Sequence, residues 1–227
     1  MKTNYVKMLG SAILFAMVAV FPSCTKEDAG AGLNLTGTVN LRIVNGAEGS
    51  GAQDFFLDNT KINSSAVAYT ETTAYTTTNA GSRQGQFKAT GSSTTTASAN
   101  LVFEKDKYYT VYLGGSASSS SVVATSDDMT PPPSGKARVR FVHLSSAVSS
   151  GIDLAITGGA KIISGLAYQT ASAYNDVDAN TAFTLYSAGS ATAALTIPAF
   201  VQAGKIYTIF ISGSSTATVS YHVTAQN

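Results

Sequence analysis

Lys107-Tyr108-Tyr109-Thr110-Val111-Tyr112-Leu113 is matched 98 residues later by Lys205-Ile206-Tyr207-Thr208-Ile209-Phe210-Ile211. In both stretches large apolar residues stand at every second position, which is the pattern of a β-strand with one buried face. These positions are Tyr109, Val111 and Leu113 in the first stretch, and Tyr207, Ile209 and Ile211 in the second. A strand that recurs at this distance predicts two versions of one β-domain.

Five further pairs of segments repeat in the same order, at offsets that stay between 98 and 100 residues. Chance would not preserve both order and spacing, so we infer an internal duplication. The pairs are Leu41–Asn45 with Val139–His143, Asp54–Leu57 with Asp153–Ile156, Lys61-Ile62 with Lys161-Ile162, Ala68-Tyr69 with Ala167-Tyr168, and Ala74-Tyr75 with Ala173-Tyr174.

The remaining pattern of each repeat also favours short strands. Asp58-Asn59 and Gly158-Gly159 fall at matching places and suit tight hairpin turns. No window shows a helical stripe. We therefore predict an all-β protein with two tandem immunoglobulin-like or transthyretin-like β-sandwich domains of six to eight strands each. With no Trp and a single cysteine, their cores must rest on Tyr, Phe, Ile, Leu and Val.

A proline-rich stretch separates the repeats. Three consecutive prolines, Pro131 to Pro133, favour an extended polyproline II segment and cannot join a central strand. We expect this linker to hold the domains apart, and residues 136–227 to fold on their own. The predicted organisation is a signal peptide at 1–23, a lipidated tether at 24–37, a first sandwich at 38–126, a linker at 127–136 and a second sandwich at 137–227.

The N-terminal residues read as an export signal. Lys2 and Lys7 precede an apolar stretch from Leu9 to Phe21, which is too short for a comfortable membrane span but suits a signal peptide. Val20-Phe21-Pro22-Ser23-Cys24 follows and resembles a lipobox. Cys24 is the only cysteine of the chain. We predict that it is lipidated and forms the mature N-terminus.

Lys26, Glu27 and Asp28 follow the predicted lipidation site directly. They resemble the export signal of Gram-negative bacteria that display lipoproteins outwards; the alternative is a solvated tether whose charges are accidental. The predicted location is the outer membrane, with the lipid-anchored chain facing the cell exterior.

The second repeat resembles the domain of unknown function 4397 family in three places. They are Ala137–Ser145, Ile152-Asp153-Leu154 and Ala203–Thr208. The first repeat diverges, with Asn45 in place of His143. The resemblance implies two tandem copies of an immunoglobulin-like or transthyretin-like sandwich in an exported protein, and it implies no activity.

Charge and motifs exclude several functions. Of 14 Lys and Arg residues only Lys2 and Lys7 precede Cys24, while all 13 acidic residues follow it, so the mature part is close to neutral. Nucleic acid is therefore not an expected partner. The sequence has no phosphate-binding loop and no signature of a metalloprotease, thiol or serine-hydrolase site. We predict no enzyme, no catalytic or metal residues and no cofactor.

Several polar residues could have either a structural or a functional role. His143 and Asp153 could form a pair that orients the imidazole for base catalysis, but a buried histidine bonded to backbone is the favoured interpretation. Asp54 and Asp153 recur with outward parity, so we expect a partner in Arg42 or Arg140; a shared ligand or calcium role is the alternative. The acidic pairs Asp127-Asp128 and Asp176-x-Asp178 are expected in solvated loops, and His222 in a strand.

Four residues have outward parity on the two quoted strands: Tyr108, Tyr112, Ile206 and Phe210. They could stack sugars or pack a partner, or they could be covered by the interdomain contact. The leading functional hypothesis is a surface binding or adhesion module whose partners are the membrane, through its lipid, and a glycan or surface protein. A structural spacer of the outer membrane is the alternative.

Overall fold

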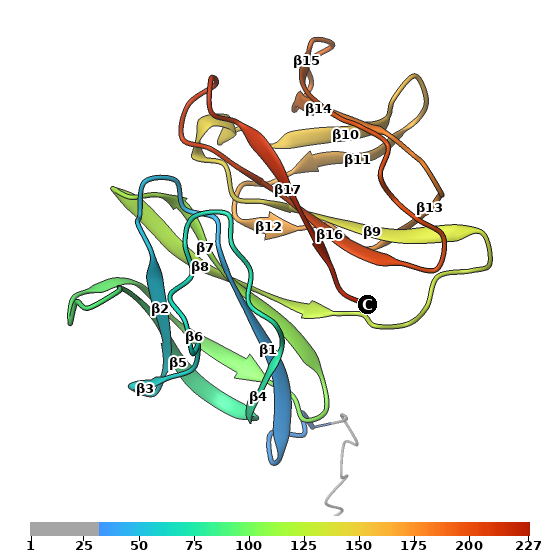
Figure 1. Cartoon of the computed structure of the whole chain (residues 1–227). Helices are drawn as coiled ribbons and strands as arrows, with labels where there is room; N and C mark the ends of the chain where they lie inside the picture. The colour runs from blue at the N-terminus through green and yellow to red at the C-terminus, as the bar shows by residue number, and fades with distance from the viewer. Residues whose placement is uncertain (1–31) are drawn as a thin grey trace, which may run out of the picture. The chain divides into compact units, whose positions relative to one another are not determined.

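The computed structural model describes residues 32–227, and these form an all-β protein (Figure 1). Cys24, Lys26, Glu27, Asp28 and the signal peptide lie outside the described residues. The described part holds one short 3-10 turn, η1 (Ser146–Val148), and no helix in it is long and apolar enough to cross a membrane. The predicted all-β fold class is confirmed.

The first eight strands form two four-stranded sheets. Sheet A has the order β4-β1-β7-β8, and sheet B has the order β3-β2-β5-β6. The strands are β1 (Thr38–Asn45), β2 (Gln53–Leu57), β3 (Thr60–Lys61), β4 (Thr76–Asn79), β5 (Gly81–Ala89), β6 (Thr95–Phe103), β7 (Tyr108–Ser116) and β8 (Ser119–Asp127).

The later strands form the other two sheets. Sheet C has the order β12-β9-β16-β17, with β13 also paired to β9, and sheet D has the order β11-β10-β14-β15. The strands are β9 (Lys136–His143), β10 (Ile152–Ile156), β11 (Lys161–Leu166), β12 (Thr170–Ala171), β13 (Asn175–Asp178), β14 (Phe183–Ser187), β15 (Ala193–Ile197), β16 (Ile206–Ser212) and β17 (Ser220–Ala225).

The strand pairing of the first half recurs in the second half. β1 pairs in parallel with β7, with Leu41 opposite Tyr109, and β9 pairs in parallel with β16, with Val139 opposite Tyr207. The hairpin partners β8 and β17 then complete sheets A and C. Both halves therefore follow one topology at the offset seen in the sequence.

Each half has its own core between its two sheets, as expected for a sandwich. Phe55, Phe87 and Val111 are fully buried between sheets A and B, and Phe141, Phe183 and Ile209 are fully buried between sheets C and D. The inward residues of the repeated strand, predicted from its alternation, belong to these cores: Tyr109, Val111, Leu113, Tyr207, Ile209 and Ile211.

The two sandwiches also pack against each other, through the faces of sheets A and C that point away from their own cores. Six buried residues form this interface cluster: Val44, Tyr112 and Val123 from the first sandwich, and Val142, Leu144 and Phe210 from the second. Residues Leu33–Asn227 accordingly form one compact unit. The expectation that the linker holds the domains apart is wrong, because each sheet carries an apolar outer face that only the other sandwich covers.

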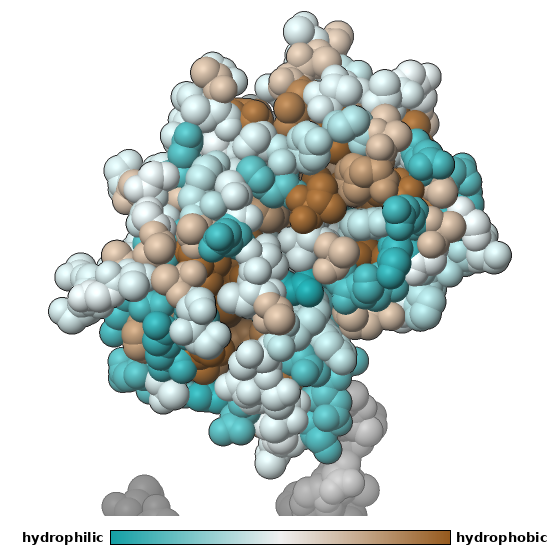
Figure 2. All heavy atoms as spheres, viewed as in Figure 1, coloured by the Kyte–Doolittle hydropathy of each residue, from teal (hydrophilic) through white to brown (hydrophobic). Residues whose placement is uncertain are grey.

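The proline segment is nevertheless the connection between the halves. β8 ends at Asp127 and β9 begins at Lys136, and the residues between them form no strand. On the face shown in Figure 2, apolar side chains form small patches separated by hydrophilic ones.

Candidate functional site

A buried ion pair joins the two sandwiches at the end of β8. Arg140 on β9 donates from Nη2 to Asp127 Oδ1 at 2.5 Å, and its other terminal nitrogen donates to the carbonyl of Ser126 at 2.8 Å. Both charged side chains are almost completely buried, with 3% and 0% of their surface exposed. Such a pair needs full hydrogen bonding to offset its desolvation.

First-sandwich hydroxyls supply those bonds on the carboxylate side. Tyr75 and Thr110 both donate to Asp127 Oδ2, at 2.7 and 2.6 Å. Burial first, and then the nearby carboxylate of Asp127, raises the pKa of Tyr75 above its usual range, so this phenol stays protonated. Both oxygens of the Asp127 carboxylate are thus hydrogen-bonded at the end of β8.

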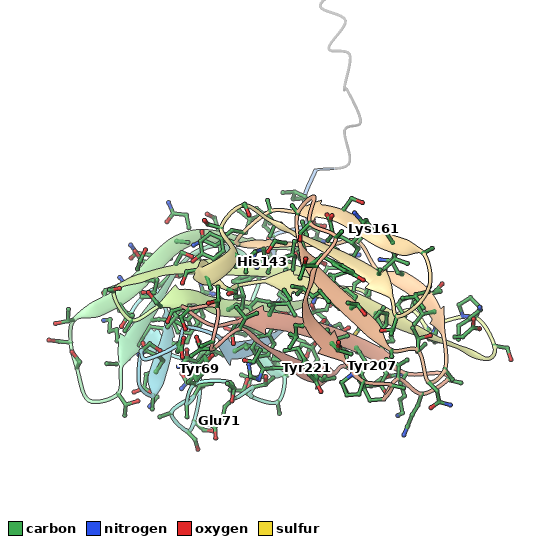
Figure 3. All side chains as sticks on the ribbon, turned by 90° about the horizontal axis from the view of Figure 1, so that it is seen from above. Tyr69, Glu71, His143, Lys161, Tyr207 and Tyr221 are labelled. Carbon is green, nitrogen blue, oxygen red and sulfur yellow. The ribbon has the colours of Figure 1, made fainter. Side chains whose placement is uncertain are left out.

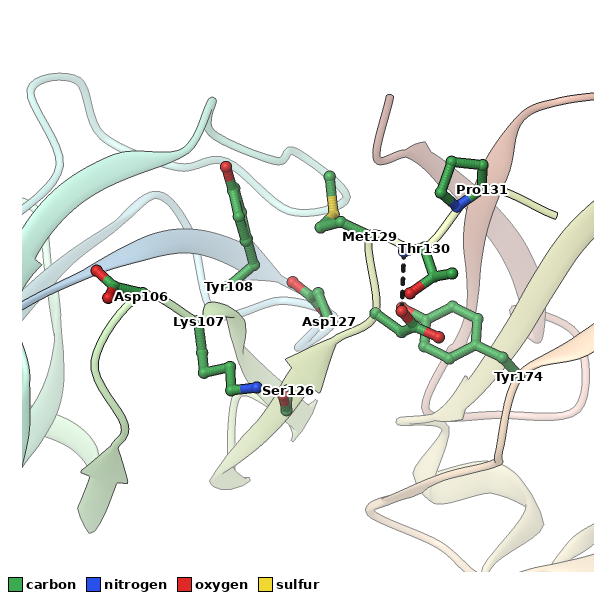
Figure 4. Close-up of a pocket in the computed structure, with 10 residues that line it drawn as sticks. Asp106, Lys107, Tyr108, Ser126, Asp127, Met129, Thr130, Pro131 and Tyr174 are labelled. Carbon is green, nitrogen blue, oxygen red and sulfur yellow. Dashed lines mark hydrogen bonds between the residues drawn. The ribbon is translucent and has the colours of Figure 1, made fainter. Parts of the chain in front are cut away.

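A groove of about 640 Å³ opens beside this pair, where β7 begins, β8 ends and the linker departs (Figure 4). Its volume lies in the range of ordinary ligand sites. Both sandwiches build it, since Tyr174 comes from the segment between β12 and β13. The lining residues are Asp106, Lys107, Tyr108, Ser126, Asp127, Asp128, Met129, Thr130, Pro131 and Tyr174.

Two half-buried tyrosines lie on opposite sides of the groove (Figure 4). Tyr108 packs edge-on against Tyr75, with ring centroids 5.1 Å apart. The Arg140 guanidinium lies 4.8 Å from the ring centroid of Tyr174, whose hydroxyl donates to Gln226 at 2.9 Å. Each ring is therefore fixed from behind by the fold, which is the arrangement that an aromatic stacking platform requires.

The rim of the groove carries both signs of charge. Asp106 and Lys107 are exposed at one end, and Asp128 is exposed at the other. Hydrogen bonds from the side chain and backbone of Thr130, with a smaller effect of Arg138, hold the pKa of Asp128 below its usual value. The groove thus offers carboxylate acceptors, an ammonium donor and the Thr130 hydroxyl around its two rings.

The alternation of the repeated strand points to Tyr108 as an outward residue, but no pattern in the sequence points to Tyr174 as a groove residue. The available signal was the match of Ala173-Tyr174 with Ala74-Tyr75, which identified a repeated position but not its surroundings. The groove itself depends on how the sandwiches pack, and no local pattern encodes that packing.

His143, labelled in Figure 3, is fully buried, and Asp153 bonds Lys161 and the backbone N–H groups of Gly165 and Gly189 instead. Its Nε2 lies 2.9 Å from the carbonyl oxygen of Val148, while Nδ1 has no hydrogen-bond partner within residues 32–227. Burial lowers the pKa of His143. The favoured interpretation, a buried histidine bonded to backbone, holds for one of the two ring nitrogens.

Asp54 and Asp153 occupy one structural position and point away from the cores that Phe55 and Leu154 enter, as predicted, but the predicted partner needs correction. Their partners are Lys61 at 2.8 Å and Lys161 at 2.6 Å, not Arg42 or Arg140. Both aspartates are nevertheless buried, and each lysine comes from the strand that follows that of its aspartate. Bonds from Lys161 and from the backbone N–H of Gly165 lower the pKa of Asp153.

The expected solvated acidic loops are only partly found. Asp127 belongs to β8 and is buried in the interdomain ion pair, which corrects the prediction for that residue. Asp176 and Asp178 lie on β13 and bond Arg138 and Lys136 across the strand pair. His222 lies on β17, as predicted, with Nε2 2.9 Å from Ser212 Oγ.

Three of the four outward residues on the repeated strand are not available to a ligand. Tyr112, Ile206 and Phe210 are buried, and the rings of Tyr112 and Phe210 meet edge-to-face at 6.2 Å across the interdomain contact. The alternative of coverage by the interdomain contact is the correct one for this pair. Burial raises the pKa of Tyr112 to about 12.

Within the described part of the chain, no group of three or more His, Cys, Asp or Glu side chains is placed to hold a metal ion.

The family described as "Domain of unknown function (DUF4397)" matches residues 39–150. The matched range covers the first sandwich, the linker, β9 and η1. We expected the second repeat to carry this resemblance, but two of its three motifs, from Ile152 and from Ala203 onward, fall outside the match. Similarity to this family is therefore supported mainly over the first repeat.

No curated protein matches the chain in sequence. Among solved structures, the chain is similar to the carbohydrate-binding module CBMbc (family CBM26) from Eubacterium rectale Amy13K, in complex with maltoheptaose. The identity is 13%, the alignment covers 84% of this chain and 98% of that chain, and the TM-score is 0.29. Similarity at that level carries no argument about what this chain binds.

Proposed function

We propose that this chain is a surface binding protein that holds an uncharged glycan in the groove between Tyr108 and Tyr174. The supporting observation is the groove itself, in which two tyrosine rings, each packed against the fold, lie on opposite sides with polar groups between them. Sugar rings present apolar C–H faces to aromatic side chains and hydroxyls to carboxylates and ammonium groups. The near-neutral mature chain suits an uncharged ligand better than a polyanion.

The groove residues favour binding over catalysis. The lining contains no histidine or cysteine, and its one fully buried acid, Asp127, is already bonded to Arg140, Tyr75 and Thr110. The groove thus offers recognition contacts without a nucleophile paired to a base.

The test of the groove is a binding screen against neutral oligosaccharides, followed by titration of the best ligand with the chain and its variants. We expect Tyr108→Ala and Tyr174→Ala each to weaken binding about 5- to 10-fold, the effect of losing one stacking contact of roughly 1 kcal/mol. Tyr186→Ala is the matched control, because Tyr186 is a half-buried tyrosine on β14 outside the groove. Equal losses of affinity in all three variants, or an affinity that neither groove variant lowers, would contradict the assignment. No binding by the native chain would favour the spacer function.

We further propose that Cys24 carries the lipid anchor and that Lys26, Glu27 and Asp28 direct the chain to the cell exterior. At least two acyl chains, each stabilised by about 0.8 kcal/mol per buried CH₂, provide stable anchoring. Cys24→Ala is therefore expected to move the protein from the membrane fraction to the soluble fraction. Alanines at Lys26, Glu27 and Asp28 should preserve the anchor but reduce cleavage by external protease. A Cys24→Ala protein that resists carbonate extraction would place the anchor elsewhere.

A further inference from the structure

The contact between the two sandwiches contains the same arginine–carbonyl hydrogen bond twice, once in each direction. Arg42 of the first sandwich donates to the carbonyl of Ala225 at 3.1 Å, and Arg140 of the second donates to the carbonyl of Ser126 at 2.8 Å. Ser126 is opposite Tyr109 and Ala225 is opposite Tyr207, so the two acceptors hold the same register in their sheets. Each sandwich thus offers the other an arginine and a carbonyl at equivalent places, as two subunits do across a two-fold axis.

The apolar contacts follow the same relation. Tyr112 and Phe210, which hold the same place in the repeated strand, pack on each other. Val44 and Val142 also hold matching places and both belong to the interface cluster. The outer face of sheet A and the outer face of sheet C are therefore two related, mutually complementary surfaces.

Two features make the pairing of unlike sandwiches better than the pairing of two second sandwiches. The side chain of Leu144 fills the space beside Gly46 and Gly114, where an added Cβ would lie 2.7 and 3.0 Å from it. In a pair of second sandwiches, Leu144 would instead meet Leu144 and Ser212, the residues at those matching positions. That crowding would be costly in a close-packed contact.

Charge also disfavours a pair of second sandwiches. The buried Arg140 is neutralised by Asp127, whereas the residue at the matching place of the second sandwich is the uncharged Gln226. In a pair of second sandwiches, both copies of Arg140 would lie next to Gln226 instead of Asp127, so the contact would lose its buried ion pair. A C face therefore favours an A face over a second C face.

Nothing in these contacts requires that both faces belong to one chain. The linker between Asp127 and Lys136 has eight residues, which can span up to about 28 Å when extended. Its three prolines favour an extended form, and exchange of a domain between copies is a low-cost route to dimers.

We infer that two copies of this chain pair by exchanging their second sandwiches, so that the A face of each copy binds the C face of the other. The pairing within one chain dominates in dilute solution, because the linker keeps the two faces at a millimolar effective concentration. Exchange becomes competitive where copies are crowded. The partner is a second copy of this chain, and the surface is the interface cluster with its arginine contacts.

The test uses two variants of the chain from residue 25 onward, one carrying Asp127→Arg and the other Arg140→Asp. Each variant alone brings like charges together within its own chain. In an exchanged dimer of the two variants, one contact keeps the native ion pair and the other carries it reversed. We expect monomers from each variant alone, and a species of twice the mass from an equimolar mixture refolded together, measured by size exclusion with light scattering.

A second pair tests the same exchange without charge. Gly46→Leu alone collides with Leu144, and Leu144→Gly alone leaves a cavity, whereas their exchanged dimer has one native and one reversed contact. We expect a dimer from this mixture too. Mixtures that stay monomeric would overturn the inference, and so would variants that are unfolded alone and remain unfolded together, because exchange should rescue them.

Discussion

At the scale of single residues, the duplication provides an internal comparison. Asn45 and His143 are matching, fully buried residues. The Asn45 amide donates to the carbonyls of Gly51 and Val67, and its oxygen accepts from the Ala47 N–H at 3.2 Å. His143 bonds only Val148. The first repeat therefore satisfies this position completely, while the second leaves one ring nitrogen without a partner among the described residues.

This difference gives a pH prediction. Burial lowers the pKa of His143 below 6.5, so the unfolded chain binds more protons than the folded one just below that pH. Its contribution to stability is complete above pH 6.5 and is lost as the pH falls toward the lowered value, by at most about 1.4 kcal/mol per pH unit. We expect His143→Asn to flatten this part of the curve, measured by urea unfolding between pH 7 and pH 5.

His222→Gln is the matched control for that measurement. Burial also lowers the pKa of His222, so this variant should remove a separate part of the same pH dependence and leave the part due to His143. If His143→Asn leaves the pH dependence of stability unchanged, the imidazole is protonated to the same extent in the folded and the unfolded chain.

At the scale of elements, matching strands differ in length for identifiable reasons. β3 has two residues, whereas β11 has six. After Lys61 the first repeat leaves the sheet, and the side chain of Asn63 takes over, with Oδ1 accepting from the Phe55 N–H at 2.6 Å. Local side-chain bonds of this kind compete with strand pairing. A hairpin that is equivalent in sequence therefore continues in one repeat and stops in the other.

At the scale of the molecule, the central feature is that sheets A and C serve two purposes. Each closes a core on its inner face and joins the other sandwich on its outer face. This arrangement builds the groove, because Tyr108 and Tyr174 meet only when the sandwiches are packed. It also means that each sandwich should lose stability when the repeats are separated.

We expect residues 136–227 alone to be less stable than the same sandwich in the full chain. Separation exposes Val142, Leu144 and Phe210, each worth roughly 1.5–3 kcal/mol when fully buried, and leaves Arg140 without Asp127. Rearrangement of the exposed side chains can recover most of this free energy. A remaining loss of about 2 kcal/mol in the free energy of unfolding still lowers the Tm by roughly 8–16 °C for a domain of this size. Calorimetry of the fragment and of the full chain measures the difference.

Addition of residues 33–127 should raise the melting temperature of the fragment, since it restores the missing face. The control is the same mixture with Arg140→Asp in residues 136–227, which should gain less. A fragment as stable as the full chain would show that the interface contributes little to stability.

The sequence by itself determined the β class, the duplication, its register and the inward faces of the repeated strand, because alternation and repetition are local signals that each strand carries. It also located the connecting segment through its prolines. Only the tertiary structure decided the partners of Asp54 and Asp153, the burial of Asp127, Tyr112 and Phe210, and the position of the groove. Those features depend on how the outer faces of the sheets pack. The alternation along a strand shows that a residue points outward, but it is the same whether water or another sandwich covers that residue.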